Sequence, residues 1–480
     1  MATHGISGPA AEAERILDNV MAFNGSSVRR IVLNVGANGY AQVVLLVSNF
    51  VAVPFYILNW GMATYGSWLS LTATIMTLFA MADAGIGPVS GNALVGAVAE
   101  GDDRKALRVL QTFWLTSTLA GIILVAAGAL VLPFVPLARM LSLSGEHAQS
   151  VTVAAVALLA VVALSFQIGI AQAAMRAIGG YASGSAVQSS MSLVELAAIC
   201  TTLSLGGGFL GVTAAMGICR LVCLVILIIL RRRASADFSY GFRHAHLGTL
   251  RALMGDAGWF MVFPICNAAA MYATVPILNL IAGPVFVASF AIARTLARTL
   301  QQAVGVFSGA TWPEITVQYI KKNMAALRTL FVAGGQFAVT VSVFAGVALF
   351  SISSWLFEIW LQGRHAPPPL LVGLLIIESA LAASKSFSDT ILMATNHHLT
   401  YAKVYLAAHV GFIGLGLFAG RSLGWVGFEI PLILLMATLL VTSSILAGRV
   451  VGLTYPAARH ALFDIKPMLA YVTRLRDRVR

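Results

Sequence analysis

The sequence predicts an all-α membrane protein that crosses the bilayer many times. Of its 480 residues, 59% are hydrophobic and only 10% are charged, and the mean hydropathy is +0.88. A soluble domain carries roughly 25% charged residues, so these charges are too few to cover a surface that faces water. The apolar stretches are continuous rather than alternating. This pattern indicates helices, which satisfy their own backbone hydrogen bonds inside lipid.

Polar residues divide the apolar sequence into about twelve segments. A helix needs ~20 apolar residues to cross ~30 Å of hydrocarbon, and each segment is close to that length. In chain order we expect spans at 31–57, 64–86, 112–136, 150–174, 183–205 and 209–230, and then at 257–281, 285–311, 330–355, 369–394, 404–420 and 425–447.

These spans fall into two sets of six. We expect an N-terminal six-helix bundle at 31–230 and a C-terminal six-helix bundle at 257–447, joined by a cytoplasmic connector at 231–256. A cytoplasmic N-terminal segment at 1–30 and a basic cytoplasmic tail at 448–480 would flank the bundles.

An internal repeat supports this division. An ungapped shift of 222 residues aligns Val53–Leu69 with Val275–Ala291. The identical pairs are Val53 with Val275, Pro54 with Pro276, Leu58 with Leu280, Gly61 with Gly283, and Ser67 with Ser289. Two halves in the same orientation are the parallel-repeat design of many transporters.

The basic residues predict that both termini are cytoplasmic. Of the 30 Lys and Arg residues, 23 fall in segments that would then be cytoplasmic, and only Arg139, Arg364 and Arg421 fall in outside loops. Inner-membrane proteins collect Lys and Arg on their cytoplasmic side. This bias accounts for the net charge of +12, so we expect a bacterial inner-membrane protein with no nucleic-acid partner. No apolar run precedes Ile31, so we expect no cleavable signal peptide.

Enzymatic chemistry is not expected. The outside loops are short, and the cytoplasmic segments contain no Walker, HExxH or GxSxG pattern. The four cysteines lie in apolar runs without further ligands at metal-site spacing. We therefore expect a protein that is not an enzyme and has no cofactor and no metal.

Two arginines lie deep in the eighth span. Arg294 is ten residues after Pro284, or ~15 Å into the membrane, and Arg298 follows one turn later on the same face. An arginine at the centre of a membrane helix costs about 2.5–3.5 kcal/mol on insertion scales. We therefore expect Arg294, Arg298 and Gln301 to face an aqueous interior, with a structural ion pair as the alternative.

The tenth span carries three further charges on one helix face, because Glu378, Lys385 and Asp389 are spaced by seven and four residues. Lys385 and Asp389 could form a salt bridge with each other or could serve transport.

Three charges lie in the N-terminal half. Arg220 and Glu195 are central in neighbouring spans, so they could form a structural pair. Asp83, near the cytoplasmic end of the second span, could coordinate a cation, take a proton or cap a helix break.

Four short motifs resemble the polysaccharide transporter family, the Wzx-type flippases of lipid-linked oligosaccharides. They are "YGSW" (65–68), "DAGIG" (83–87), "EGD" (100–102) and "GATWPEIT" (309–316), and their order and span positions match. This family lies in the MOP superfamily with the lipid II flippase and the MATE drug exporters.

The resemblance implies two six-helix bundles around a central cavity that the first, second, seventh and eighth spans line. It implies alternating access that carries an undecaprenyl-diphosphate-linked oligosaccharide, a precursor of O-antigen or exopolysaccharide, from the cytoplasmic to the periplasmic leaflet. The implied partners are this anionic glycan, membrane lipids and glycan polymerase machinery.

Each charged candidate then has an expected role. Arg294 and Arg298 would receive the diphosphate and acidic sugars, for which the arginine fork is suited. The candidate translocation residues are Arg294, Arg298, Arg220, Lys385 and Gln301. The candidates for coupling to H⁺ or Na⁺ are Asp83, Glu195, Glu378 and Asp389.

Two other functions compete with this one. A MATE-like drug or cation antiporter of the same fold would need an acidic cavity, which the deep arginines disfavour. A membrane glycan polymerase or ligase would need exposed periplasmic catalytic groups, which the short outside loops disfavour.

Overall fold

The computed structural model describes residues 25–83, 86–234, 239–259 and 261–453. All regular secondary structure in these ranges is helical, which confirms the predicted all-α fold. Most of the predicted N-terminal segment and of the predicted basic tail lies outside the described residues.

The described part of the first half starts with one long helix, α2, which bends back on itself. The helices are α2 (Gly25–Asp83), α3 (Ile86–Ala99), α4 (Asp103–Val131), the 3₁₀ turn η1 (Leu132–Phe134), α5 (Leu137–Met140), α6 (Gly145–Ala177), α7 (Tyr181–Ser204) and α8 (Phe209–Ala234).

The second half contains a short π-helical turn, η2, in its first span. The elements are α9 (Leu247–Ala257), α10 (Val262–Ala268), η2 (Ala269–Ala273), α11 (Thr274–Ala282), α12 (Pro284–Ala297), α13 (Thr299–Ile320), α14 (Met324–Trp360), α15 (Pro369–Ala394) and α16 (Leu399–Val450).

The predicted polytopic topology agrees with these helices. Nine helices among the described residues are long and apolar enough to cross a membrane. Two of them, α2 and α16, each contain two of the predicted spans. Helices α12 and α13, which are not among the nine, together form one further predicted span. Counted in this way, the described residues contain the twelve expected segments.

Glycines make the sharp reversals. Gly61 bends α2 with φ 73° and ψ 171°, and Gly283 separates α11 from α12 with φ 81° and ψ 173°. Residues with a side chain rarely adopt a positive φ, so both positions need glycine. These two residues are a pair in the 222-residue repeat, so the repeat reproduces a backbone conformation as well as a sequence pattern. Gly424 bends α16 in a related way, with φ 63°.

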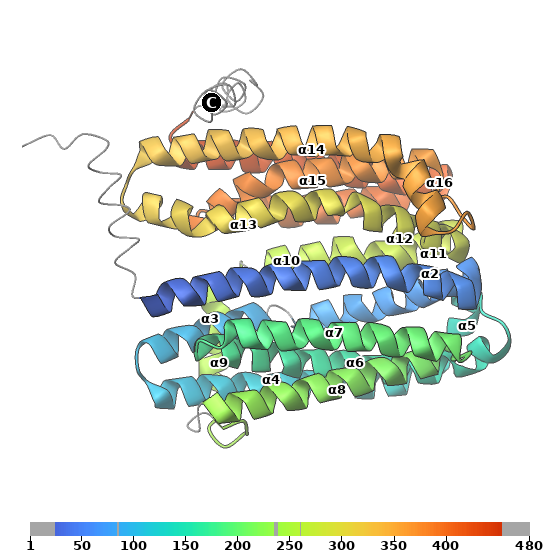
Figure 1. The fold of residues 1–480 in the computed structure, drawn as a ribbon, viewed down its shortest axis with the longest axis horizontal. Coiled ribbons are helices and arrows are strands. Elements are labelled where there is room, and N and C mark those ends of the chain that lie inside the picture. The colour runs from blue at the N-terminus through green and yellow to red at the C-terminus, as the bar shows by residue number, and fades with distance from the viewer. Residues whose placement is uncertain (1–24, 84–85, 235–238, 260, 454–480) are drawn as a thin grey trace, which may run out of the picture.

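The helices form two groups with α2 between them (Figure 1). The first arm of α2 lies between α7, in the N-terminal half, and α10, in the C-terminal half, while α13 to α16 lie beyond α10. α2 packs against α7 on one side and against α12, α11 and η2 on the other. Within the part of the chain that the structure describes, α2 is therefore the seam between the two halves.

Many large apolar side chains point outward, as lipid contact requires. Ile218 of α8 is 64% exposed, Phe344 of α14 is 67% exposed and Phe418 of α16 is 74% exposed. On a water-soluble protein such apolar patches would promote aggregation, and here they indicate a hydrocarbon surround.

We call the end of the molecule with Gly61, Gly283 and Gly424 the kink end, and the end where α2 begins and α16 finishes the terminus end. The halves meet at the kink end. Trp360 Nε1 donates a hydrogen bond to the Phe50 carbonyl oxygen at 2.6 Å, and Asn279 Nδ2 donates to the Met140 carbonyl oxygen at 3.0 Å.

A close backbone approach adds to this contact, because a Cβ on Gly66 would lie 1.7 Å from the Pro284 carbonyl oxygen. Gly66 belongs to the "YGSW" motif. Its neighbour Ser67 donates to the Leu141 carbonyl oxygen at 2.6 Å, and the Tyr65 and Trp68 rings are buried. The motif therefore builds the junction of the two halves at the kink end.

One basic residue lies elsewhere than predicted. Arg231 was expected at the start of a solvated connector, but α8 continues to Ala234 and Arg231 is only 1% exposed. Its guanidinium carbon lies 4.5 Å from the centroid of the Tyr240 ring, a stacking contact that compensates part of the cost of burial. Burial raises the pKa of the Tyr240 hydroxyl, in the loop after α8, to about 12.

Candidate transport cavities

The C-terminal half contains a cavity of about 400 Å³, which we call the C-cavity. Helices α10, α11, α12, α13, α15 and α16 and the π-turn η2 supply its walls. Its charged lining consists of three basic side chains and one acidic side chain, namely Arg294, Arg298, Lys385 and Glu378. The sequence placed these residues on two helix faces, and the fold brings both faces to one cavity.

Arg294 is held by backbone and hydroxyl oxygens. Its Nη1 donates to the Met271 carbonyl oxygen at 2.9 Å and to Thr274 Oγ1 at 3.4 Å, and its guanidinium carbon lies 4.9 Å from the Phe290 ring centroid. Met271 lies in η2, and π-helical turns leave carbonyl oxygens free for such contacts. This arrangement orients the guanidinium group without neutralising it.

Arg298 and Gln301 continue the same face. Arg298 stands at the junction of α12 and α13, and Gln301 Nε2 donates to Ser379 Oγ on α15 at 3.2 Å. Among the described residues, neither Arg294 nor Arg298 has a carboxylate oxygen within 4.0 Å. Neither guanidinium group is therefore neutralised by a salt bridge among the described residues.

The cavity also has acidic neighbours, one of which the sequence analysis missed. Glu378 lines the wall, and Glu429 on α16 lies close enough to Glu378 and Arg294 to interact electrostatically with both. Glu429 is only 1% exposed, and neither of its carboxyl oxygens has a hydrogen-bond partner among the described residues. Glu429 lies near the start of the predicted span 425–447, where a charged side chain can reach water. In the structure α16 continues through Gly424, and Glu429 lies inside the protein.

Of the two roles left open for Lys385 and Asp389, the structure contains the salt bridge. Lys385 Nζ lies 2.5 Å from Asp389 Oδ2, and the Tyr401 hydroxyl donates to Asp389 Oδ1 at 2.8 Å. Lys385 still lines the C-cavity, so it combines an ion pair with a place in the wall. Asp389 is held by two partners and is not part of the cavity wall.

A tyrosine and histidine pair lies beside this salt bridge, and the sequence analysis missed it too. The Tyr405 hydroxyl donates to Asn267 Oδ1 at 2.7 Å, and the Tyr405 ring lies 4.3 Å from that of His409. His409 is 2% exposed, and its Nδ1 lies 2.8 Å from the Tyr405 carbonyl oxygen. A regular spacing in the first arm of α16, with Tyr401, Tyr405 and His409 four residues apart, is the signal that could have revealed it.

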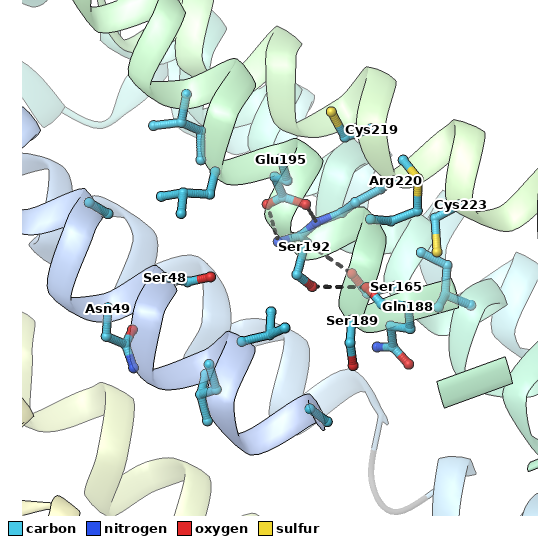
Figure 2. A pocket seen from close by; sticks show the side chains of 18 of the residues that line it. Ser48, Asn49, Ser165, Gln188, Ser189, Ser192, Glu195, Cys219, Arg220 and Cys223 are labelled. Atoms are coloured by element: carbon cyan, nitrogen blue, oxygen red, sulfur yellow. Dashed lines mark hydrogen bonds and ion pairs between the residues drawn. The ribbon is translucent and has the colours of Figure 1, made fainter. Parts of the chain in front are cut away.

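The N-terminal half contains a second, larger cavity of about 840 Å³, which we call the N-cavity. Residues of α2, α6, α7 and α8 line it. Its charged lining is the pair Arg220 and Glu195 (Figure 2), joined by two contacts of 3.4 Å. Arg220 Nη1 also donates to Ser165 Oγ at 2.9 Å. The structure thus separates Arg220 and Glu195 from the charges of the C-cavity.

Asp83 lies apart from both cavities. It is the last residue of α2 and belongs to neither wall, although it interacts with neighbouring groups. The structure therefore places five of the nine candidate residues in the C-cavity wall and two in the N-cavity wall, while Asp389 is paired with Lys385 and Asp83 lies in neither wall.

Comparison with known proteins identifies the fold but not the family. No family model matches the sequence, and no curated protein matches it either. Solved structures of transporters do match in three dimensions.

The inward-facing conformation of a multidrug resistance MATE family transporter of the MOP superfamily aligns with a TM-score of 0.68. The identity is 14%, over 84% of this chain and 95% of that one. An outward-facing conformation of such a transporter aligns with a TM-score of 0.63 and 14% identity, over 88% and 96% of the two chains. The MATE multidrug transporter DinF-BH aligns with a TM-score of 0.63 and 16% identity, over 88% and 95%.

The chain is thus an all-α polytopic membrane protein with a MATE-like fold. At these identities the likeness establishes the architecture alone, and the cargo must be argued from the cavities.

Proposed function

We propose that this protein is a flippase that moves an undecaprenyl-diphosphate-linked oligosaccharide from the cytoplasmic to the periplasmic leaflet of a bacterial inner membrane. The observation that carries the proposal is the pair Arg294 and Arg298 in the C-cavity, with no carboxylate of the described residues within ion-pair distance. Guanidinium groups inside a membrane protein without a carboxylate partner are costly unless they face water or receive an anion. Arginine binds phosphate oxygens with two parallel hydrogen bonds, so a diphosphate fits this site.

Alternating access is the proposed mechanism. Contacts at the kink end join the halves, whereas the N-cavity extends toward the terminus end, since its residues Ser185 and Gln188 lie in the first two turns of α7. With both termini cytoplasmic, the N-cavity would accept cargo from the cytoplasmic side. The higher TM-score of the inward-facing MATE structure supports this assignment.

The membrane potential can contribute to the direction of transport. Moving one charge through 100 mV corresponds to about 2.3 kcal/mol. A headgroup with two negative charges that leaves a cell with a negative interior therefore releases about 4–5 kcal/mol at that potential. An anionic cargo needs no other energy source to favour export.

The acidic residues of the C-cavity indicate H⁺ as the coupling ion, because a carboxylate can bind and release a proton. Glu378 and Glu429 lie close enough to Arg294 to interact with it electrostatically, and Glu429 has no hydrogen-bond partner among the described residues. A buried carboxylate without partners is strongly disfavoured, so a proton on Glu429 would stabilise the closed C-cavity. The same two residues are the specific observation in favour of a MATE-like antiporter as the second candidate function.

The experiment that separates the candidates is lipid analysis of a deletion strain. A flippase deletion should accumulate one lipid-linked glycan in the cytoplasmic leaflet, because synthesis continues while translocation stops. The proposal fails if no such lipid accumulates and the strain instead becomes sensitive to cationic drugs. Translocated but unpolymerised glycan would favour the polymerase or ligase alternative.

A further inference from the structure

The N-cavity differs from the C-cavity in the chemistry of its lining. Its two charged side chains, Glu195 and Arg220, neutralise each other. The remaining polar lining consists of hydroxyl and amide groups, namely Gln42, Ser48, Asn49, Tyr56, Ser165, Ser185, Gln188, Ser189 and Ser192. Such a surface offers many hydrogen-bond donors and acceptors and no net formal charge.

One of these hydroxyls has an unmet hydrogen-bonding capacity. Ser48 Oγ is buried and has no hydrogen-bond partner among the described residues. Buried polar atoms are nearly always bonded, so an orphaned hydroxyl in a cavity wall points to a group that the cavity receives. Figure 2 shows Ser48 on α2, and Gln188, Ser189 and Ser192 on α7, around the same space.

The apolar part of the lining suits the same kind of ligand. Leu45, Met76, Ile168 and Ile199 line the same wall as the hydroxyl groups. A sugar ring has polar edges and apolar C–H faces, so it matches a wall that mixes both. An aliphatic chain would leave the hydroxyl and amide groups unpaired, and each such group costs about 1–3 kcal/mol. An organic cation would find the carboxylate of Glu195 already paired with Arg220.

The position of the N-cavity allows one molecule to use both sites. α2 lines the N-cavity, and it packs directly against η2, α11 and α12, which line the C-cavity. The two cavities therefore flank the same seam. The N-cavity, at about 840 Å³, has roughly twice the volume of the C-cavity, at about 400 Å³. If one cargo molecule has two portions, the larger portion therefore belongs in the N-cavity.

We propose that the N-cavity is a saccharide site, which binds the uncharged sugar portion of the cargo whose anionic portion the C-cavity binds. This inference rests on the proposed flippase function. It assigns Ser48 and Gln188 to sugar recognition and Arg220 and Glu195 to a structural pair that keeps the site uncharged.

Binding measurements on the purified full-length protein test this division. The probes are farnesyl diphosphate and three derivatives that carry a single glucose, galactose or N-acetylglucosamine on the diphosphate. At least one sugar derivative should bind the unmodified protein more tightly than farnesyl diphosphate does. Ser48→Ala and Gln188→Leu should each remove about fivefold of that gain, as expected for one hydrogen bond, and should leave farnesyl diphosphate binding unchanged.

The variants are chosen to keep the fold. Ser48→Ala breaks no hydrogen bond among the described residues, so the protein should unfold at an unchanged temperature. Thr201→Ala on α7, an exposed position outside the cavity wall, is the matched control and should change neither binding constant.

Two negative results have different meanings. If the sugars add no affinity, or if both N-cavity variants keep all of it, the saccharide site is overturned while the flippase proposal stands. If farnesyl diphosphate binding is absent, or is unaffected by Arg294→Ala, the flippase proposal itself fails. Weaker binding of a cationic rhodamine dye in Ser48→Ala, with sugar binding intact, would assign the N-cavity to drugs and overturn the inference.

Discussion

The two cavities hold arginines in opposite ways. Arg220 in the N-cavity meets the carboxylate of Glu195 at 3.4 Å and a serine hydroxyl at 2.9 Å. Arg294 in the C-cavity meets a carbonyl oxygen at 2.9 Å and a threonine hydroxyl. A carboxylate cancels the charge of a guanidinium group, whereas a carbonyl dipole orients it and leaves its charge in place. Glu378 and Glu429 act on Arg294 only from beyond salt-bridge distance. We therefore expect Arg220 to be structural and Arg294 to be available to an anion.

The largest effect on transport is expected when Arg294 or Arg298 of the C-cavity is replaced. Arg294→Ala and Arg298→Ala should each block surface glycan in a complementation assay while protein levels hold. Arg294→Lys should retain partial function, because the charge remains but the two-pronged hydrogen bonding does not. Normal export in both alanine variants would break the contrast between the cavities, since the C-cavity charge would then have no role.

A large effect is also expected where the two halves meet. Gly66→Ala places a Cβ 1.7 Å from the Pro284 carbonyl oxygen, a backbone atom that cannot move aside cheaply. We expect a loss of about 1–3 kcal/mol of stability or a shift away from the conformation closed at the kink end. Distance measurements between spin labels on α2 and α12 should report the separation. Gly96→Ala, where nothing lies within 4 Å, is the control, and equal behaviour of the two variants would contradict this account of the junction.

A smaller effect should follow from breaking the pair in the N-cavity. Glu195→Gln leaves Arg220 without its carboxylate, and we expect a loss of about 1–3 kcal/mol of stability in thermal unfolding. The double change Glu195→Gln with Arg220→Gln should recover most of this loss, because no unpaired charge remains. If the double variant transports normally, the pair is structural, as proposed. If it is stable and cannot transport, Arg220 belongs to the transport machinery and the contrast is wrong.

The smallest effect on stability is expected at Glu429. Glu429→Gln replaces a carboxyl that has no hydrogen-bond partner among the described residues with an amide of similar size, so the unfolding temperature should change little. Transport should become less dependent on pH, because a proton on Glu429 can no longer be exchanged. Transport rates measured across a pH range of about 5.5–8.5 in vesicles test this. An unchanged pH profile would remove Glu429 from ion coupling, and Glu358→Gln, at the exposed end of α14, is the control.

Much of the fold could be predicted because lipid imposes a single strong constraint. Apolar runs of the required length must be helices, and their number fixes the topology. The pairing of Gly61 with Gly283 also carried structural information, since both adopt the same rare backbone conformation. Sequence patterns could not show that α2 and α16 continue through their bends, because a glycine between two apolar runs also suits a loop.

The candidate site was only partly predictable. Local spacing revealed Arg294 with Arg298 and Lys385 with Asp389, which lie one helical turn apart. The serines of the N-cavity gave no signal, because serines in membrane helices commonly bond to the carbonyl oxygen one turn earlier, as Ser192 does to Gln188 at 3.0 Å. Only the packing of α2 on α7 shows which hydroxyls face a cavity.

The most direct test is translocation by the purified protein in vesicles. A fluorescent undecaprenyl-diphosphate-linked sugar should cross the bilayer with the unmodified protein and stop crossing when Arg294 and Arg298 are both replaced by alanine. A cationic dye measured in parallel should not be moved by either protein. Undiminished lipid translocation by the double variant, or dye transport that persists without these arginines, would contradict the assignment of the C-cavity to an anionic cargo.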